Sequence, residues 1–258
     1  MARSEYLSGN DPCSETTSRM AETQPGLKTD LHLHSSEDPA DVITHDAYTL
    51  IDKAVDLGFD ALALTLHDRQ LTEPRVFDYA RDHGVTLLAG VERTIEGRHV
   101  LLLNFAQGTE QVRTFADLAR LKSRANGLVI AAHPFFPDRA CLRSMLDKHA
   151  DLFDAVEWSY FWTSGLNFNR PAARWADAHG KPVVGNSDLH DLRQLGRTFS
   201  FVSAERNPEA ICEAIREGRV SLQTSAVPKL ELAQVLTGMF RRGTKPAAAV
   251  DTARLATT

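Results

Sequence analysis

The sequence predicts one α/β domain built on a mostly parallel sheet. A barrel of the TIM type is the leading architecture, and a doubly wound open sheet is the alternative. Short apolar runs alternate with segments of helical periodicity along most of the chain, which is typical of strands joined by crossover helices. About eight such units are what a TIM-type barrel requires. Strands are expected at residues 28–34, 60–66, 85–91, 99–105, 128–132, 154–159, 182–186 and 198–202.

Helix boundary signals support this alternation. Thr44 can cap the first helix, and Leu57-Gly58 can end it. Asn126-Gly127 and His179-Gly180 are expected to end two later helices, because each precedes an apolar run directly.

The ends of the chain differ from its middle. Residues 1–26 and 243–258 lack periodicity and are rich in small or polar residues, so we expect two disordered tails around a barrel domain at 27–242. No stretch approaches the roughly 18 apolar residues that a membrane span needs, and we expect no membrane partner.

Composition restricts the choice of partners and compartment. The net charge of -5 provides no basic surface for a polyanion, which argues against a nucleic-acid partner and favours a small substrate. Cys13, Cys141 and Cys212 are an odd and widely spaced set, typical of reduced thiols in the cytoplasm. The sequence does not predict an oligomeric state.

The stretch TDLHLHSSED contains two histidines inside an apparently buried strand. Alternate side chains of a strand share a face, so Asp30, His32 and His34 should point one way, and Leu31 and Leu33 the other. Two imidazoles would then converge on one spot.

Imidazoles and carboxylates recur where later strands begin or end, and in a barrel the carboxyl ends of the strands carry the chemistry. Such nitrogen and oxygen donors suit zinc, manganese or iron, and their number exceeds what one ion can bind. Two or three ions would generate hydroxide and neutralise phosphoryl oxygens, which predicts hydrolysis at phosphorus. The residues are His32, His34, His67, Asp68, Glu92, His99, His133, Asp188 and His190, whereas His45, His83, His149 and His179 are expected to have no catalytic role.

The motifs DLHLH, GVE, AAHP and NSDLH, in this order between Lys28 and about Gln223, resemble those of the polymerase and histidinol phosphatase (PHP) family. The resemblance implies a distorted (β/α)7 TIM-like barrel with up to three metals. Members include phosphomonoesterases, nucleotide phosphatases and exonuclease-like polymerase domains. The implied metal ligands are His32, His34, His67, Glu92, His99, His133, Asp188 and His190, with Glu92 bridging two ions and Glu92, Asp188 and His190 catalytic.

Two positions depart from the pattern of the family. The aspartate that follows HxH is not at its usual spacing in SSEDPAD, so Asp38 is the chosen ligand and Asp41 the alternative, although either could cap the next helix. The family usually writes TDH where this chain has TLHD. Asp68 therefore follows His67, and the carboxylate that orients this imidazole is absent or placed elsewhere.

Residues near the last ligands are candidates for substrate binding. Arg193 and Arg197 could contact a phosphate or lie solvated on the surface. The aromatic residues of the sixth strand end could wall a pocket, stack a base or simply close the barrel, namely Trp158, Tyr160, Phe161 and Trp162.

The sequence therefore predicts a metal-dependent phosphomonoesterase that uses two or three divalent ions (Mn, Zn or Fe). A small phosphorylated metabolite or nucleotide would be attacked by metal-activated hydroxide. One alternative is a phosphodiesterase or exonuclease acting on nucleic-acid ends. Another is a catalytically silent PHP binding module.

Overall fold

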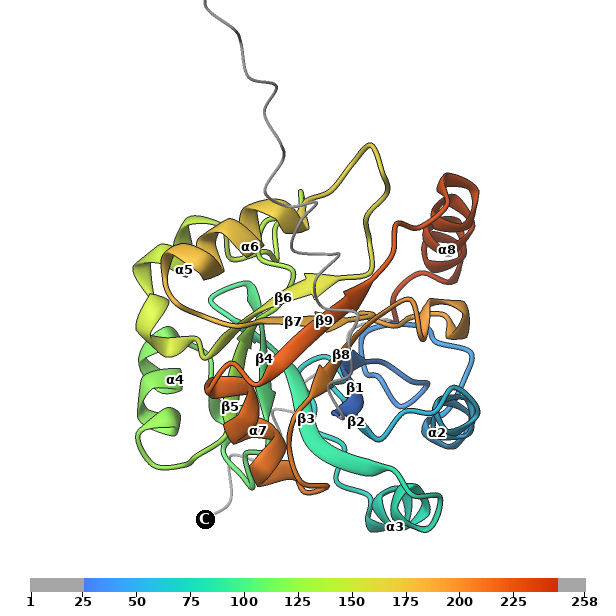
Figure 1. Cartoon of the computed structure of the whole chain (residues 1–258), viewed down its shortest axis with the longest axis horizontal. Coiled ribbons are helices and arrows are strands. Elements are labelled where there is room, and N and C mark those ends of the chain that lie inside the picture. The colour runs from blue at the N-terminus through green and yellow to red at the C-terminus, as the bar shows by residue number, and fades with distance from the viewer. Residues whose placement is uncertain (1–25, 246–258) are drawn as a thin grey trace, which may run out of the picture.

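The computed structural model describes residues 26–245, so residues 1–25 and 246–258 of the expected tails lie outside the described part of the chain. A nine-stranded sheet curls into a nearly closed barrel with helices around it (Figure 1). The strands are β1 (Leu27–Leu33), β2 (Ala61–Leu64), β3 (Thr86–Ile95), β4 (Arg98–Leu103), β5 (Leu128–Ala131), β6 (Ala155–Ser159), β7 (Val183–Asn186), β8 (Thr198–Val202) and β9 (Val220–Thr224). The α-helices are α2 (Ala47–Asp56), α3 (Pro74–Asp82), α4 (Phe115–Lys122), α5 (Ser144–Lys148), α6 (Asn169–Ala178), α7 (Pro208–Arg216) and α8 (Lys229–Arg242).

The strand order is β7-β6-β5-β4-β3-β2-β1-β8-β9. The segment that follows β7 returns to β1, because His34 N–H donates to the Leu189 oxygen at 3.1 Å and Leu189 N–H donates to the His32 oxygen at 3.2 Å. These bonds bring the two sides of the sheet together beside the residues predicted to bind metal. The predicted distorted TIM-like barrel is confirmed.

The sheet is less parallel than the sequence predicted. β4 pairs antiparallel with both β3 and β5, and β8 pairs antiparallel with both β1 and β9. The β3–β4 connection is a two-residue turn at Glu96 and Gly97, with φ angles of 49° and 75°. Positive φ at both positions is the signature of the tight type I′ hairpin, which leaves no room for a crossover helix.

A bulge in β1 changes the predicted faces of this strand. The register with β2 shifts between Asp30 and Leu33, so the strict alternation breaks. Leu31 packs in the cluster at the barrel floor, whereas Leu33 packs beneath α2 and α3. Asp30 does not join the histidines but accepts from Ser187 N–H at 3.1 Å, and its burial raises the pKa of the carboxyl group to about 7.

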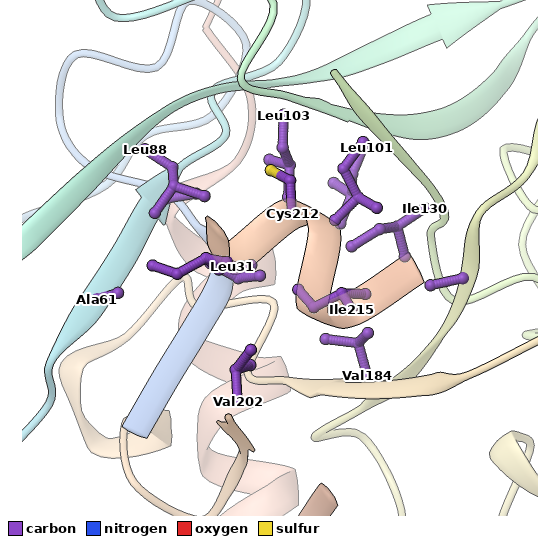
Figure 2. Close-up of a cluster of buried hydrophobic side chains, with 14 of the residues drawn as sticks. Leu31, Ala61, Leu88, Leu101, Leu103, Ile130, Val184, Val202, Cys212 and Ile215 are labelled. Carbon is purple, nitrogen blue, oxygen red and sulfur yellow. The ribbon is translucent and has the colours of Figure 1, made fainter. Parts of the chain in front are cut away.

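Helix α7 closes the barrel at the end opposite to the histidines. Cys212 and Ile215 of α7 lie among side chains from the strands, including Leu31, Leu101 and Ile130 (Figure 2). Burial of apolar surface contributes about 25 cal/mol per Å². This packed floor can therefore hold the strands in place while their other ends carry polar groups.

The predicted helix ends are partly correct. Asp46 rather than Thr44 caps α2, because its side chain accepts from Thr49 N–H at 2.8 Å. Gly58 and Gly180 follow α2 and α6 with positive φ, as expected of helix C-terminal glycines. Helix α4 already ends at Lys122, before Asn126-Gly127. Among the described helices, none has both the length and the apolar character required to span a bilayer.

Candidate metal centre

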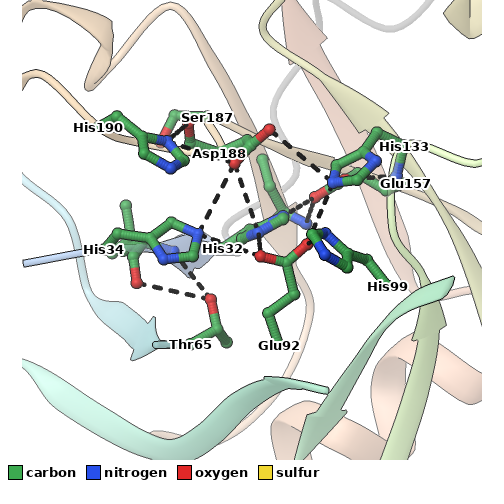
Figure 3. A network of polar contacts seen from close by, with 12 residues as sticks. His32, His34, Thr65, Glu92, His99, His133, Glu157, Ser187, Asp188 and His190 are labelled. Carbon is green, nitrogen blue, oxygen red and sulfur yellow. Dashed lines mark hydrogen bonds and ion pairs between the residues drawn. The ribbon is translucent and has the colours of Figure 1, made fainter. Parts of the chain in front are cut away.

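The eight residues that the family resemblance implies as metal ligands meet at one end of the barrel. Figure 3 labels all of them except His67. Four overlapping groups of three side chains have ligand atoms within 4.8 Å of one another. They are His34, His67 and His190; His32, Glu92 and His133; His32, His34 and Asp188; and His67, Glu92 and His99. The sequence prediction of a convergent cluster therefore agrees with the geometry, although which residues bind an ion stays a prediction.

Glu92 lies at the centre of the cluster and is 1% exposed. Its Oε1 lies 2.7 Å from His99 Nδ1 and 3.1 Å from His133 Nε2. Its Oε2 faces three other imidazoles, at distances of 3.2–3.4 Å from the Nε2 atoms of His32, His34 and His67. Each carboxylate oxygen thus faces a different set of imidazoles, which is the arrangement that a bridging ligand needs.

Two carboxylates outside the cluster fix how the inner imidazoles point. Glu157 Oε1 lies 2.8 Å from His32 Nδ1, and Asp38 Oδ2 lies 2.9 Å from His34 Nδ1. An ionised carboxylate can only accept, so Nδ1–H must donate in both pairs. The Nε2 atom of each ring then carries the lone pair in the neutral form.

These Nε2 atoms test whether the site fits a metal. His32 and His34 are fully buried, and neither Nε2 has a hydrogen-bond partner among residues 26–245. His32 Nε2 instead faces acceptor oxygens, Glu92 Oε2 at 3.3 Å and Asp188 Oδ1 at 3.5 Å. Burying such atoms unpaired costs about 1–3 kcal/mol each. A divalent cation would satisfy both the lone pairs and the carboxylates, so the residues fit a metal centre.

The pKa values of two of these imidazoles also indicate that the site favours positive charge. Burial alone would lower the pKa of His32, but the carboxylates of Glu157, Asp188 and Glu92 raise it well above its ordinary value. Burial opposes a similar rise at His67, whose pKa is raised to about 9 chiefly by Glu92 and Asp38. The carboxylates around these rings therefore favour positive charge, which a cation would supply.

The two aspartates considered for the HxH motif have different positions. Asp38 is fully buried, and its oxygens accept from His34 and His67 Nδ1–H and from three main-chain N–H groups. It therefore lies behind the rings, which favours an orienting role over the metal-ligand role predicted for it. Asp41 Oδ2 lies 3.0 Å from His190 Nε2 and is the acid that reaches the cluster.

Asp38 also answers the question raised by the TLHD motif. Asp68 lies away from the His67 ring, because its Oδ1 accepts from Arg93 Nη1 at 2.9 Å and from Thr94 N–H at 2.7 Å. The carboxylate that orients His67 is Asp38, whose Oδ2 is 3.0 Å from His67 Nδ1. The orienting group is thus supplied from the loop after β1.

The predicted substrate-binding residues are already partnered. Arg193 donates through Nε and Nη2 to the Asp191 carboxylate, each at 2.9 Å, and Arg197 Nη2 donates to Glu231 at 2.8 Å. The Tyr160 hydroxyl also donates to Glu231 at 2.9 Å. The structure does not bring the two arginines into the cluster, so phosphate binding by them stays a prediction.

Two residues next to the ligands were not predicted from the sequence. Glu157 is fully buried, and its carboxylate accepts hydrogen bonds from His32 Nδ1, the His133 main-chain N–H and the Asn186 side-chain amide. A single acid inside the apolar run of β6 was the available signal. Cys141 Sγ lies 3.4 Å from His133 Nδ1, and nothing in the local sequence indicates this contact.

The four histidines set aside in the sequence do not join these groups. His45 is buried, but its Nε2 contacts the main-chain oxygen of His34 at 3.0 Å. His83 and His179 each contact a main-chain oxygen of their own helix. His149 stacks on Phe115 with ring centroids 4.0 Å apart.

Comparison with known proteins yields one family match and several similar structures. A family described as PHP-associated matches residues 167–220. No curated protein sequence matches the chain. A two-domain protein from Bacteroides vulgatus that contains a predicted PHP-like metal-dependent phosphoesterase is 22% identical, with a TM-score of 0.58, over 84% of this chain and 69% of that one.

Two further structures have the same fold. An amidohydrolase from Chromobacterium violaceum is 16% identical with a TM-score of 0.52, and the match covers 87% of this chain and 99% of that chain. A lesion-specific endonuclease from Pyrococcus furiosus is 20% identical with a TM-score of 0.52, over 76% of this chain and 57% of that one. Because this neighbour is an endonuclease, the expectation that nucleic acid is an unlikely partner finds no support.

Proposed function

Taking the chain as a PHP-type barrel, by its fold and its PHP-associated segment, we propose that it is a metal-dependent phosphoesterase. Two or three divalent ions would be held at the barrel end by the cluster around Glu92. The observation that carries this proposal is the pair of buried Nε2 atoms of His32 and His34, which lack hydrogen-bond partners within the described part of the chain and face carboxylate oxygens.

The residues fall into sets that could share several ions. His32, His34 and Asp188 form one set, and His34, His67 and His190 form another. A third lies around Glu92 Oε1, which is 2.7 Å from His99 Nδ1 and 3.1 Å from His133 Nε2. Asp41 adds an oxygen beside His190. Glu92 would link the sets, because its two oxygens face different imidazoles.

Divalent ions in such a site supply hydroxide at neutral pH and offset negative charge on phosphoryl oxygens. The residues of the chain make this possible by holding the donor atoms in place. Glu157 and Asp38 keep the protons of His32, His34 and His67 on Nδ1, so that Nε2 faces the centre. The side chains of His99, His67 and Asp188 are 20%, 15% and 13% exposed, whereas the imidazoles of His32 and His34 are fully buried. Substrate would therefore enter from the side on which the three exposed residues lie.

We propose a small phosphorylated metabolite or nucleotide as the substrate. The net charge of -5 offers little attraction for a long polyanion. The rival activity, cleavage of a phosphodiester at a nucleic-acid end, is kept because a similar barrel belongs to an endonuclease.

The test is a phosphate-release screen with purified protein supplied with manganese, zinc or iron. Nucleotides and sugar phosphates form the monoester arm, and a 5′-labelled oligonucleotide with bis(p-nitrophenyl) phosphate forms the diester arm. Phosphate release that is lost in Asp188→Asn and kept in the control His83→Ala, a histidine of the α3 end, supports the proposal. Cleavage of diesters alone would favour the nuclease reading. Metal binding without any hydrolysis would identify a silent binding module.

A further inference from the structure

The imidazoles of the centre differ in what their outward nitrogens contact. In three of these imidazoles the outward Nδ1 contacts a carboxylate oxygen. Glu157 Oε1 lies 2.8 Å from His32 Nδ1, and Asp38 Oδ2 lies 2.9 Å from His34 Nδ1 and 3.0 Å from His67 Nδ1. A fourth ring has an oxygen too, because His190 Nδ1 lies 3.0 Å from the main-chain oxygen of Asp188. Four rings are thus oriented by oxygen acceptors.

His133 and His99 lack such an oxygen. The outward Nδ1 of His133 contacts a thiol, Cys141 Sγ, at 3.4 Å. His99 faces Glu92 through Nδ1, and within residues 26–245 its Nε2 has no protein hydrogen-bond partner. The His99 side chain is the most exposed of the six imidazoles, at 20%, whereas His133 at 12% lies between His67 at 15% and His190 at 9%.

The outward partner affects how strongly an imidazole binds a cation. A carboxylate or carbonyl oxygen fixes the ring and increases the electron density at the inward nitrogen, and losing such a partner typically costs about 10–100-fold in metal affinity. A thiol is a weak hydrogen-bonding group. His133 and His99 should therefore be the least rigidly held imidazole ligands, and they share one oxygen, Glu92 Oε1.

We propose that the ion held by Glu92, His99 and His133 is the most weakly bound ion of the centre, and that Cys141 is a positioning residue for His133. This inference rests on the proposed function, because it requires a centre with more than one metal ion. The other ions, facing His32, His34 and His67, would form a tighter class.

The experiment is equilibrium dialysis of the metal-free full-length chain against Mn²⁺, with bound ions per chain counted at each free concentration. The expected result is two classes of sites whose dissociation constants differ by about 10–100-fold. Cys141→Ala should weaken the weaker class by about tenfold and leave the tighter class unchanged. Cys141→Ser keeps a hydrogen-bonding atom on the same carbon and should recover part of the loss.

Cys212→Ala is the matched control, because Cys212 is an equally buried thiol in α7 at the opposite end of the barrel. It should leave both classes unchanged. If Cys141→Ala does not fold, Asp38→Asn makes the opposite test, since it should weaken the tighter class and spare the weaker one.

Binding of all ions in one class would overturn the inference. So would a Cys141→Ala effect on both classes or on neither, or an Asp38→Asn effect confined to the weaker class. A chain that binds no metal at any concentration would contradict the proposed function itself, whereas a single class of bound ions contradicts only this inference.

Discussion

Substitution of the two aspartates after the HxH motif separates an orienting role from a ligand role. Asp38→Asn keeps the shape of the side chain but leaves one accepting oxygen in place of two. Asp38 Oδ1 accepts from Ala40 and Asp41 N–H, and Oδ2 accepts from His34, His67 and the His67 main-chain N–H. Whichever oxygen becomes the amide nitrogen, at least two donors lose their acceptor.

The size of the effect follows from these contacts. A hydrogen bond to a charged group contributes about 1.5–3 kcal/mol. Loss of two such bonds at the lower end of this range costs about 3 kcal/mol, which lowers the melting temperature of a domain of this size by about 6–12 °C. Asp41 has one side-chain partner, His190 Nε2, and is 24% exposed, so Asp41→Asn should cost about 1 kcal/mol, or about 2–4 °C.

The assay is thermal unfolding of both metal-free variants, followed by elemental analysis after reloading. We expect Asp38→Asn to melt well below Asp41→Asn without metal, and Asp41→Asn to lose bound metal with little loss of stability. Equal melting temperatures, or a lower one for Asp41→Asn, would refute the orienting role of Asp38.

Three further outcomes are expected. Asp188→Asn and His190→Ala should each reduce the rate of phosphate-ester hydrolysis by several orders of magnitude, while circular dichroism and thermal melting show an intact barrel. Wild-type turnover in either variant would place the chemistry elsewhere. The pKa of His67 is raised to about 9, so its contribution to stability is complete below its ordinary pKa and is lost as the pH rises through 9. The metal-free protein should therefore melt at a lower temperature at pH 9 than at pH 6.5. Metal uptake at pH 7.5 in weak buffer should release protons. Removal of metal by a chelator should lower the melting temperature, because ions present at about 100 times their dissociation constant stabilise the folded protein by about 2.7 kcal/mol. An unchanged melting temperature would show that metal binding does not stabilise the fold.

The sequence predicted the strand ends well because the signals are local. Apolar runs bounded by glycine, histidine or aspartate mark the strands, and a barrel then brings their carboxyl ends together. Positions such as His133 and His190 follow from this rule without any contact information. The cluster was therefore predictable from local signals, except that the same rule also selected Asp68, whose carboxylate contacts Arg93 and Thr94 instead.

Features that depend on pairing between distant segments were not predictable. The bulge in β1 depends on its register with β2 and turns Asp30 towards Ser187. The antiparallel β4 could have been anticipated, since Glu96-Gly97 leaves only two residues between strands. Asp38 also orients His67, 29 residues away, and Glu157 orients His32, 125 residues away, and a local pattern does not specify such distant partners.

The number of divalent ions bound per chain tests the central claim most directly. The claim is that the imidazoles and carboxylates around Glu92 form a centre for more than one metal ion. Elemental analysis of protein purified after growth with manganese, zinc and iron should find more than one transition-metal ion per chain. Less than one ion per chain would contradict the account.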